Sequence, residues 1–141
     1  MRRRPTLRLL LVCLLALVMS PRSVLAQDTT AAETAATAWL AQVDAGKYAD
    51  SWTSAASAFK QAVTQEKWQD AVKRVRDQVG ALKSRTKSSA APMTNPPGAP
   101  AGEYVIIQYS ATFEQRATAT ETVTAVRDAD GTWRIVGYFV Q

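Results

Sequence analysis

The segment EYVIIQYSATFE, residues 103–114, has the clearest strand pattern in the chain. Apolar side chains take every second position from Val105 to Phe113, with Gln108, Ser110 and Thr112 between them. Because successive side chains of a strand point to opposite faces of a sheet, this alternation predicts a long strand with one dry face.

The neighbouring residues predict further strands. Threonines alternate with Ala119, Glu121, Val123 and Ala125 over residues 117–127, and the hairpin signal Asp130-Gly131 then leads into a strand over 133–140, so these two strands should pair antiparallel. On the last strand Trp133 and Tyr138 are five positions apart. In a regular strand such residues point to opposite faces of the sheet, so only one of them is expected on the concave face. Residues 82–93 are a candidate fourth strand, and the proline-rich stretch 92–102 is expected to be a loop.

The residues before 81 have apolar side chains three and four positions apart, which predicts three helices, at about 30–44, 48–63 and 64–79. Gly46 and Gly80 are expected to end the first and the third, and Thr64 to cap the third. Ala71 belongs to the inward stripe of the third helix in this prediction. Helices followed by an antiparallel meander indicate an α+β domain: three helices packed on a curved sheet of three to four strands, cone-like. The pattern leaves open whether the concave side forms one pocket or is filled by side chains.

Residues 1–26 have the three regions of a secretory signal peptide: a basic start, an apolar run over 9–19 and Val24-Leu25-Ala26 at the end. We expect cleavage after Ala26, which leaves residues 27–141 as one domain without a membrane anchor, exported to a periplasm or secreted. The apolar run is too short to span a bilayer of about 30 Å. Cys13 belongs to this leader.

The net charge of +5 belongs to the leader, because five of the seventeen basic residues lie there. Residues 27–141 carry twelve bases against twelve acids and neither cysteine nor histidine, which argues against nucleic-acid binding, thiolate chemistry and the usual zinc sites. No metal and no cofactor is expected. The surplus of bases over 64–87 is interpreted as a solvated helix face with ion pairs at four-residue spacing.

A series of motifs resembles one bacterial family along almost all of residues 27–141. They are Asp44-x-Gly46-x-Tyr48-x-x-Ser51-Trp52, Trp68, Arg76-x-x-x-Gly80, Arg85, Gly98-x-Pro100-x-Gly102-Glu103-Tyr104, Glu121 and Gly131-x-Trp133-Arg134-x-x-Gly137-Tyr138. The chain is identified by them as a member of the exported domain-of-unknown-function family number four thousand and nineteen. That resemblance implies a distant likeness to the cone-shaped nuclear transport factor two-like superfamily, and it implies no activity.

Acid-base chemistry needs a carboxylate and a tyrosine on one pocket, and Asp44, Tyr48, Tyr109 and Glu121 are the candidates. Glu121 shares its face with apolar residues, so either it is buried with a partner or that face is the solvent side. Arg85, taken to lie on an adjacent strand, is the expected partner in a bidentate pair. A pair of this kind more often stabilises a fold than catalyses a reaction.

Three functions follow as hypotheses. The preferred one is a non-catalytic binding or accessory module of the cell envelope. It uses the concave face of the sheet, its pocket or a strand edge to hold a partner protein or small apolar ligand, with Tyr48, Trp52, Arg85, Tyr109 and Tyr138 as the binding residues, although aromatic stripes usually form cores. The first alternative is a small lyase or isomerase with a carboxylate and a tyrosine. The second is a structural dimer through the sheet, because residues 136–140 are apolar on both faces.

Overall fold

The computed structural model describes residues 28–141, and the expected leader with its Cys13 lies outside them. Four helices precede four strands: α1 (Thr30–Asp44), α2 (Tyr48–Thr53), α3 (Ser57–Ala62), α4 (Gln65–Val79), β1 (Leu82–Thr94), β2 (Glu103–Phe113), β3 (Arg116–Arg127) and β4 (Trp133–Val140). The strands form one antiparallel sheet in the order β1-β2-β3-β4. The predicted α+β class is thereby confirmed. Within the described residues no helix is both long and apolar enough to cross a membrane.

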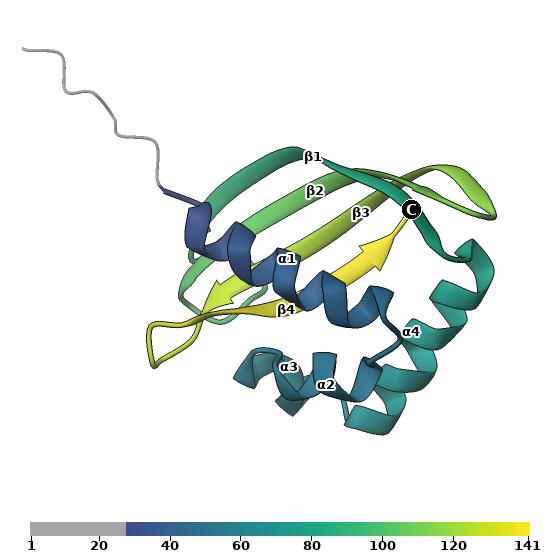
Figure 1. The fold of residues 1–141 in the computed structure, drawn as a ribbon. Helices are drawn as coiled ribbons and strands as arrows, with labels where there is room; N and C mark the ends of the chain where they lie inside the picture. Colours follow the sequence, from purple (N-terminus) through teal and green to yellow (C-terminus); the bar gives the residue numbers. More distant parts are fainter. Residues whose placement is uncertain (1–27) are drawn as a thin grey trace, which may run out of the picture.

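Helix α1 lies along the curved sheet and covers its inner, concave face (Figure 1). Its buried side chains pack against the inward residues of β2, β3 and β4, and together they form the main core. The inner face is therefore filled: Ala32, Ala36, Trp39, Leu40, Val43, Val105, Ile107, Val123, Ala125 and Ile135 are all at most 4% exposed. This burial of apolar area is the main contribution to stability that the fold offers.

The second predicted helix, over 48–63, is wrong as one element, because the chain leaves the helical conformation at Ser54–Ala56. Ala56 has an extended backbone, and its amide donates to the carbonyl of Ile135 on β4 at 2.8 Å. Ala55 and Ala56 are fully buried. Their small side chains let the backbone approach β4 so closely that a bond to the sheet replaces a turn of helix.

The third predicted helix has the expected ends but a different inward face. Thr64 accepts a hydrogen bond from the amide of Lys67, and Gly80 follows the last turn with φ of 77°. Ala71, predicted inward, is exposed, whereas Arg76 is buried with Trp68, Val72 and Val79. The inward stripe therefore contains one charged side chain that must find a partner.

A bulge in β4 changes which aromatic residues face inward. Ala125 pairs with Ile135 but Thr124 pairs with Gly137, so Val136 is an extra residue that shifts the alternation. Trp133 and Tyr138 consequently both pack against the main core. The prediction that only one of them lines the concave face is wrong, because strict alternation was assumed across the bulge.

The loop between β1 and β2 is shorter than predicted. Strand β1 continues to Thr94, with Pro92 opposite Val105, so the connecting loop begins at Asn95 rather than at Pro92. Strand β1 lies at the border of the sheet, where a proline without an amide hydrogen is tolerated. The tight turn at Gly131, with φ of 81°, joins β3 to β4 as predicted.

Candidate functional site

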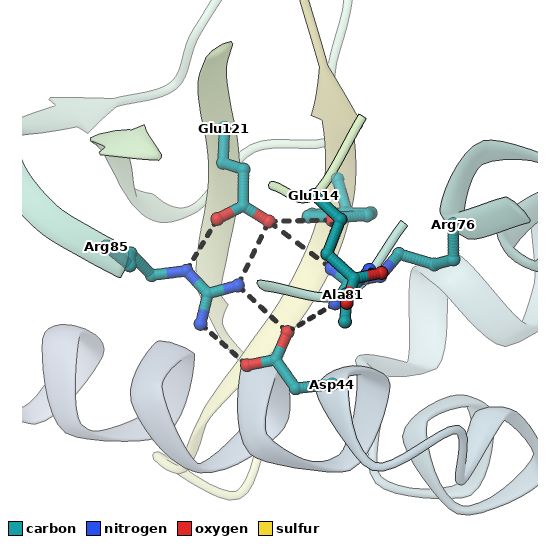
Figure 2. Close-up of polar contacts among 7 residues, drawn as sticks. Asp44, Arg76, Ala81, Arg85, Glu114 and Glu121 are labelled. Atoms are coloured by element: carbon teal, nitrogen blue, oxygen red, sulfur yellow. Dashed lines mark hydrogen bonds and ion pairs between the residues drawn. The ribbon is translucent and has the colours of Figure 1, made fainter. Parts of the chain in front are cut away.

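Five polar side chains from five elements meet on the inner side of the sheet, and we call them the inner ion cluster: Asp44, Arg76, Arg85, Glu121 and Tyr138 (Figure 2). Asp44 is the last residue of α1, and Arg76 lies in the last turn of α4. The other three come from β1, β3 and β4. The cluster thus joins both long helices to three strands.

Arg85 and Glu121 form the bidentate pair that the sequence predicted. Nε of Arg85 donates to Oε2 of Glu121 at 2.5 Å, and Nη2 donates to Oε1 at 3.1 Å. The two strands are not adjacent, contrary to the prediction, because β2 lies between them. Ala111 on β2 pairs with Arg85 on one side, and its methyl group leaves space for the guanidinium to reach across.

Asp44 bridges the two arginines. Its Oδ2 accepts from Nη1 of Arg85 at 2.7 Å, and its Oδ1 accepts from Nη2 of Arg76 at 2.7 Å. Nη2 of Arg85 also donates to Oδ1 at 3.0 Å. One carboxylate at the end of α1 therefore fixes the position of α4 relative to β1, as Figure 2 shows.

Tyr138 completes the cluster from β4. Its hydroxyl donates to Oε1 of Glu121 at 2.8 Å and accepts from Nη1 of Arg76 at 3.3 Å. The Tyr138 ring packs edge-on against Trp39, with ring centroids 5.3 Å apart. Burial raises the pKa of Tyr138, and the neighbouring Glu121 carboxylate raises it further. The hydroxyl consequently keeps its proton at neutral pH and serves as a donor.

The inner ion cluster is balanced in charge, with two carboxylates and two guanidinium groups. Burial acts to raise the pKa of Asp44, but the guanidinium groups of Arg85 and Arg76 outweigh it and hold this pKa below its usual value. The C-terminal ends of α1 and α4 lie beside the arginines, and a helix C-terminus favours cations. Within residues 28–141 every buried side-chain nitrogen and oxygen has a hydrogen-bond partner. The arrangement stabilises its charges and leaves no free base.

A shallow hollow of about 490 Å³ lies beside the inner ion cluster. It is lined by the ends of both long helices and by side chains that include Asp44, Tyr48, Arg76 and Asp77. Asp44 is the cluster carboxylate that reaches this hollow, because its side chain is 24% exposed whereas that of Glu121 is fully buried. Of the candidate acid-base residues, the structure brings Asp44 and Tyr48 to this hollow, and Glu121 lies behind Asp44 in the cluster.

The other candidate binding residues lie in the packing of the domain. Tyr109 is 6% exposed on the inner face of β2, where burial raises its pKa. Trp52 is half-buried, and its indole donates to the carbonyl of Val63 at 2.8 Å. Tyr109 belongs to the main core, and Trp52 packs against it.

Arg76 is the functional-site residue that sequence reasoning missed. It was counted among the solvated bases of residues 64–87, yet its side chain is 7% exposed and its guanidinium lies over the ring of Phe113, 5.0 Å from the centroid. The available signal was its position four residues after Val72 and eight after Trp68, on the inward stripe of α4.

The outer face of the sheet has a different chemistry. An apolar groove of about 330 Å³, which we call the outer groove, opens there beneath the β1–β2 loop. Its walls come from the loop, from the end of β1, from β2 and β3, and from the bulged part of β4: Met93, Pro96, Ala99, Pro100, Tyr104, Ile106, Thr124, Val136 and Gly137. Phe139, 52% exposed, stands beside it on β4, opposite Thr122. Toward the other end of this face, β3 presents threonines 118, 120 and 122.

Comparison with known proteins adds a family but no activity. The family model described as a protein of unknown function (DUF4019) matches residues 35–138, a range that contains every member of the inner ion cluster and every residue that lines the outer groove, and that ends just before Phe139. No curated protein matches the sequence significantly.

Proposed function

The chain belongs to the DUF4019 family of proteins of unknown function, and we propose that it is a non-catalytic binding module that acts through the outer face of its sheet. The observation that carries this proposal is the contrast between the two faces. The inner face is filled by the core and by the charge-balanced inner ion cluster. The outer face carries the outer groove and an exposed aromatic ring.

The chemistry of the inner ion cluster argues against the lyase or isomerase alternative. Such an enzyme needs a carboxylate that holds or accepts a proton near neutral pH, which requires a raised pKa. The pKa of Asp44, the cluster carboxylate that reaches the hollow, is shifted in the opposite direction. Glu121 is fully buried, and both its oxygens already accept hydrogen bonds from Arg85. A paired and buried cluster of this kind is typical of a structural role.

The surroundings that we propose for this module are the cell envelope or the outside of the cell. The proposal rests on the basic, apolar and small-residue regions of residues 1–26. The absence of cysteine from residues 27–141 also matters, because an exported chain without cysteine depends on packing alone for its stability. A filled inner face supplies that packing.

The same absence of cysteine allows a clean test in intact cells. We expect a thiol introduced by Thr120→Cys, exposed on the outer face, to react with a membrane-impermeant maleimide. If a partner covers this face, labelling in cells that export the protein is several-fold slower than labelling of the dilute purified protein. Gln78→Cys, exposed on α4, is the matched control and should react equally fast in both settings.

Two outcomes would contradict the proposal. Equal labelling of the Thr120→Cys variant in cells and in dilute solution would mean that nothing covers the outer face. No labelling of either variant in intact cells, with full labelling after lysis, would mean that the protein is not exported.

A further inference from the structure

We infer that the partner of the outer face is a second copy of this chain, with Phe139 of each copy seated in the outer groove of the other. This inference rests on the proposed function, because it names the occupant of the same face. The observation behind it is a protruding side chain, which we call the knob, next to an apolar groove on the same surface. The knob is Phe139, and the hollow is the outer groove.

The outer groove has the size and lining that a benzyl group needs. Its volume is about 330 Å³, and a cavity of about 150 Å³ in another protein already accepts benzene. The wall is apolar apart from the hydroxyls of Thr124 and Tyr104, and the Tyr104 hydroxyl donates to the carbonyl of Pro100 at 2.8 Å. A phenyl ring entering this groove would leave no buried polar group of Tyr104 without a partner.

The place of Phe139 explains why it does not fill its own groove. Gly137, which lines the groove, and Phe139 are two residues apart on β4, so both face outward and the ring stands beside the hollow. Gly137 has no side chain to close the space between them. A knob next to a hollow on one face is self-complementary, and a twofold axis in the plane of the face brings each knob to the other hollow.

The charges of the outer face favour a copy of itself over an anionic partner. Among the outward residues of the described strands, those around the knob and groove carry no charge: they are threonine, valine, isoleucine, tyrosine, methionine, alanine, glycine and the exposed amide of Gln108. Arg134, at the end of β4, is paired with Asp128 and Asp130. Two copies therefore meet without like-charge repulsion, whereas a nucleic acid or an anionic lipid surface requires a cluster of free bases.

The area of the face also fits a dimer. Strand β3 has 12 residues, which gives a length of about 40 Å, and four strands give a width of about 19 Å. The product, roughly 750 Å², is an upper limit for the area that one copy can bury, because the outer face is convex and β4 has only 8 residues. That limit is close to the roughly 800 Å² per partner that stable interfaces bury.

The first test measures the mass of the exported protein by light scattering from micromolar to submillimolar concentration. We expect a dimer, and we expect Phe139→Lys to raise its dissociation constant at least about thirtyfold, as for an aromatic residue at the centre of an interface. Gln78→Lys adds the same charge on the exposed side of α4 and should leave the dimer unchanged. Phe139 is half exposed, so at concentrations where the parent protein is a monomer the two melting curves should nearly coincide.

The second test locates the interface. Facing sheets lie about 10 Å apart, so a short bis-maleimide should link two copies of the Thr122→Cys variant and none of the Gln78→Cys variant. A monomer at every concentration overturns the inference, and so does a dimer that Phe139→Lys does not weaken. A monomer whose outer face is nevertheless covered in cells would identify a different partner and leave the proposed function standing.

Discussion

Glu121 is the residue that places the largest demand on the fold, because a fully buried carboxylate is tolerated only with its partners in place. Its two oxygens accept three short hydrogen bonds, two from Arg85 and one from Tyr138. The attraction between the charges contributes little net stability to the fold. Leaving either charge unpaired in the interior, by contrast, would destabilise it strongly. The residue thus fixes the relative positions of β1, β3 and β4.

We expect Glu121→Gln to lower the free energy of unfolding by about 3–5 kcal/mol, because the neutral amide leaves the Arg85 charge partly uncompensated. Urea unfolding at neutral pH measures this loss. Asp77→Asn is the control, since it removes an exposed pair with Lys73 and should cost less than about 1 kcal/mol. If both variants unfold at the same urea concentration, the inner ion cluster does not stabilise the fold.

The stability that Asp44 contributes to the fold is expected to depend on pH. Its pKa in the folded protein lies below its usual value because of Arg85 and Arg76, although burial opposes them. A lowered carboxyl pKa contributes stability that is complete above the unfolded pKa, about 4, and is lost as pH falls through the folded pKa. We therefore expect the difference in stability between the parent protein and Asp44→Asn to be largest at neutral pH.

The measurement is urea unfolding of both proteins at pH values from neutral to about 3. The difference in the free energy of unfolding should shrink as the pH falls below about 4, because the unfolded parent chain then takes up a proton at Asp44 that the folded protein does not bind until its own lower pKa. A difference that stays constant over this range, or grows in acid, would contradict the lowered pKa.

Residue patterns predicted one pair of the inner ion cluster, two of its five members, although Asp44 and Tyr138 were also named as candidate site residues. The Arg85–Glu121 pair could be predicted, because an acid on an apolar strand face needs a basic partner. The involvement of Asp44 and Arg76 could not, since it depends on how the ends of α1 and α4 meet in space. Periodicity identifies the inward face of each helix, but it does not show which inward charges face each other.

At the scale of elements, the ends of the helices were more predictable than their continuity. Gly46 and Gly80 have positive φ, as residues that end helices often do. The break at Ser54–Ala56 was missed because alanine is a strong helix former, and the bond between Ala56 and Ile135 that overrides it is a tertiary contact. The β4 bulge was also missed, because it depends on how β4 pairs with β3 and not on a local pattern of residues.

Gly80 is expected to be more sensitive to substitution than Gly46. A Cβ atom at Gly80 would lie 3.0 Å from Cβ of Glu114 on the sheet side, whereas nothing lies within 4 Å of one at Gly46. The backbone of Gly80, with ψ of −167°, is also in a region almost restricted to glycine.

We expect Gly46→Ala to cost about 1–2 kcal/mol from the positive φ alone, and Gly80→Ala to cost at least about 1 kcal/mol more. Thermal or urea unfolding of the two variants gives the comparison. Equal losses would mean that the contact between the end of α4 and Glu114 adjusts without cost, and that the junction between α4 and β1 is looser than the structure indicates.

At the scale of the whole molecule, the two faces of the sheet differ in what covers them. The inner face is occupied by α1, the aromatic core and the inner ion cluster, which link the helices to the strands. The outer face carries the outer groove and Phe139. The α+β architecture was predictable, because the apolar residues have helical spacing in the first half of the chain and strand-like alternation in the second. Which face is filled depends on side-chain packing, and the sequence left that question open.

The two faces can be compared directly with a photo-crosslinking amino acid placed at position 139 on the outer face or at position 48 beside the inner ion cluster. Both positions are at least partly exposed, so the probe reaches solvent in either case. After illumination of cells that export the protein, we expect a discrete covalent adduct from position 139 and none from position 48. An adduct from position 48 alone would mean that binding takes place at the hollow beside Asp44, and it would contradict the assignment of function to the outer face.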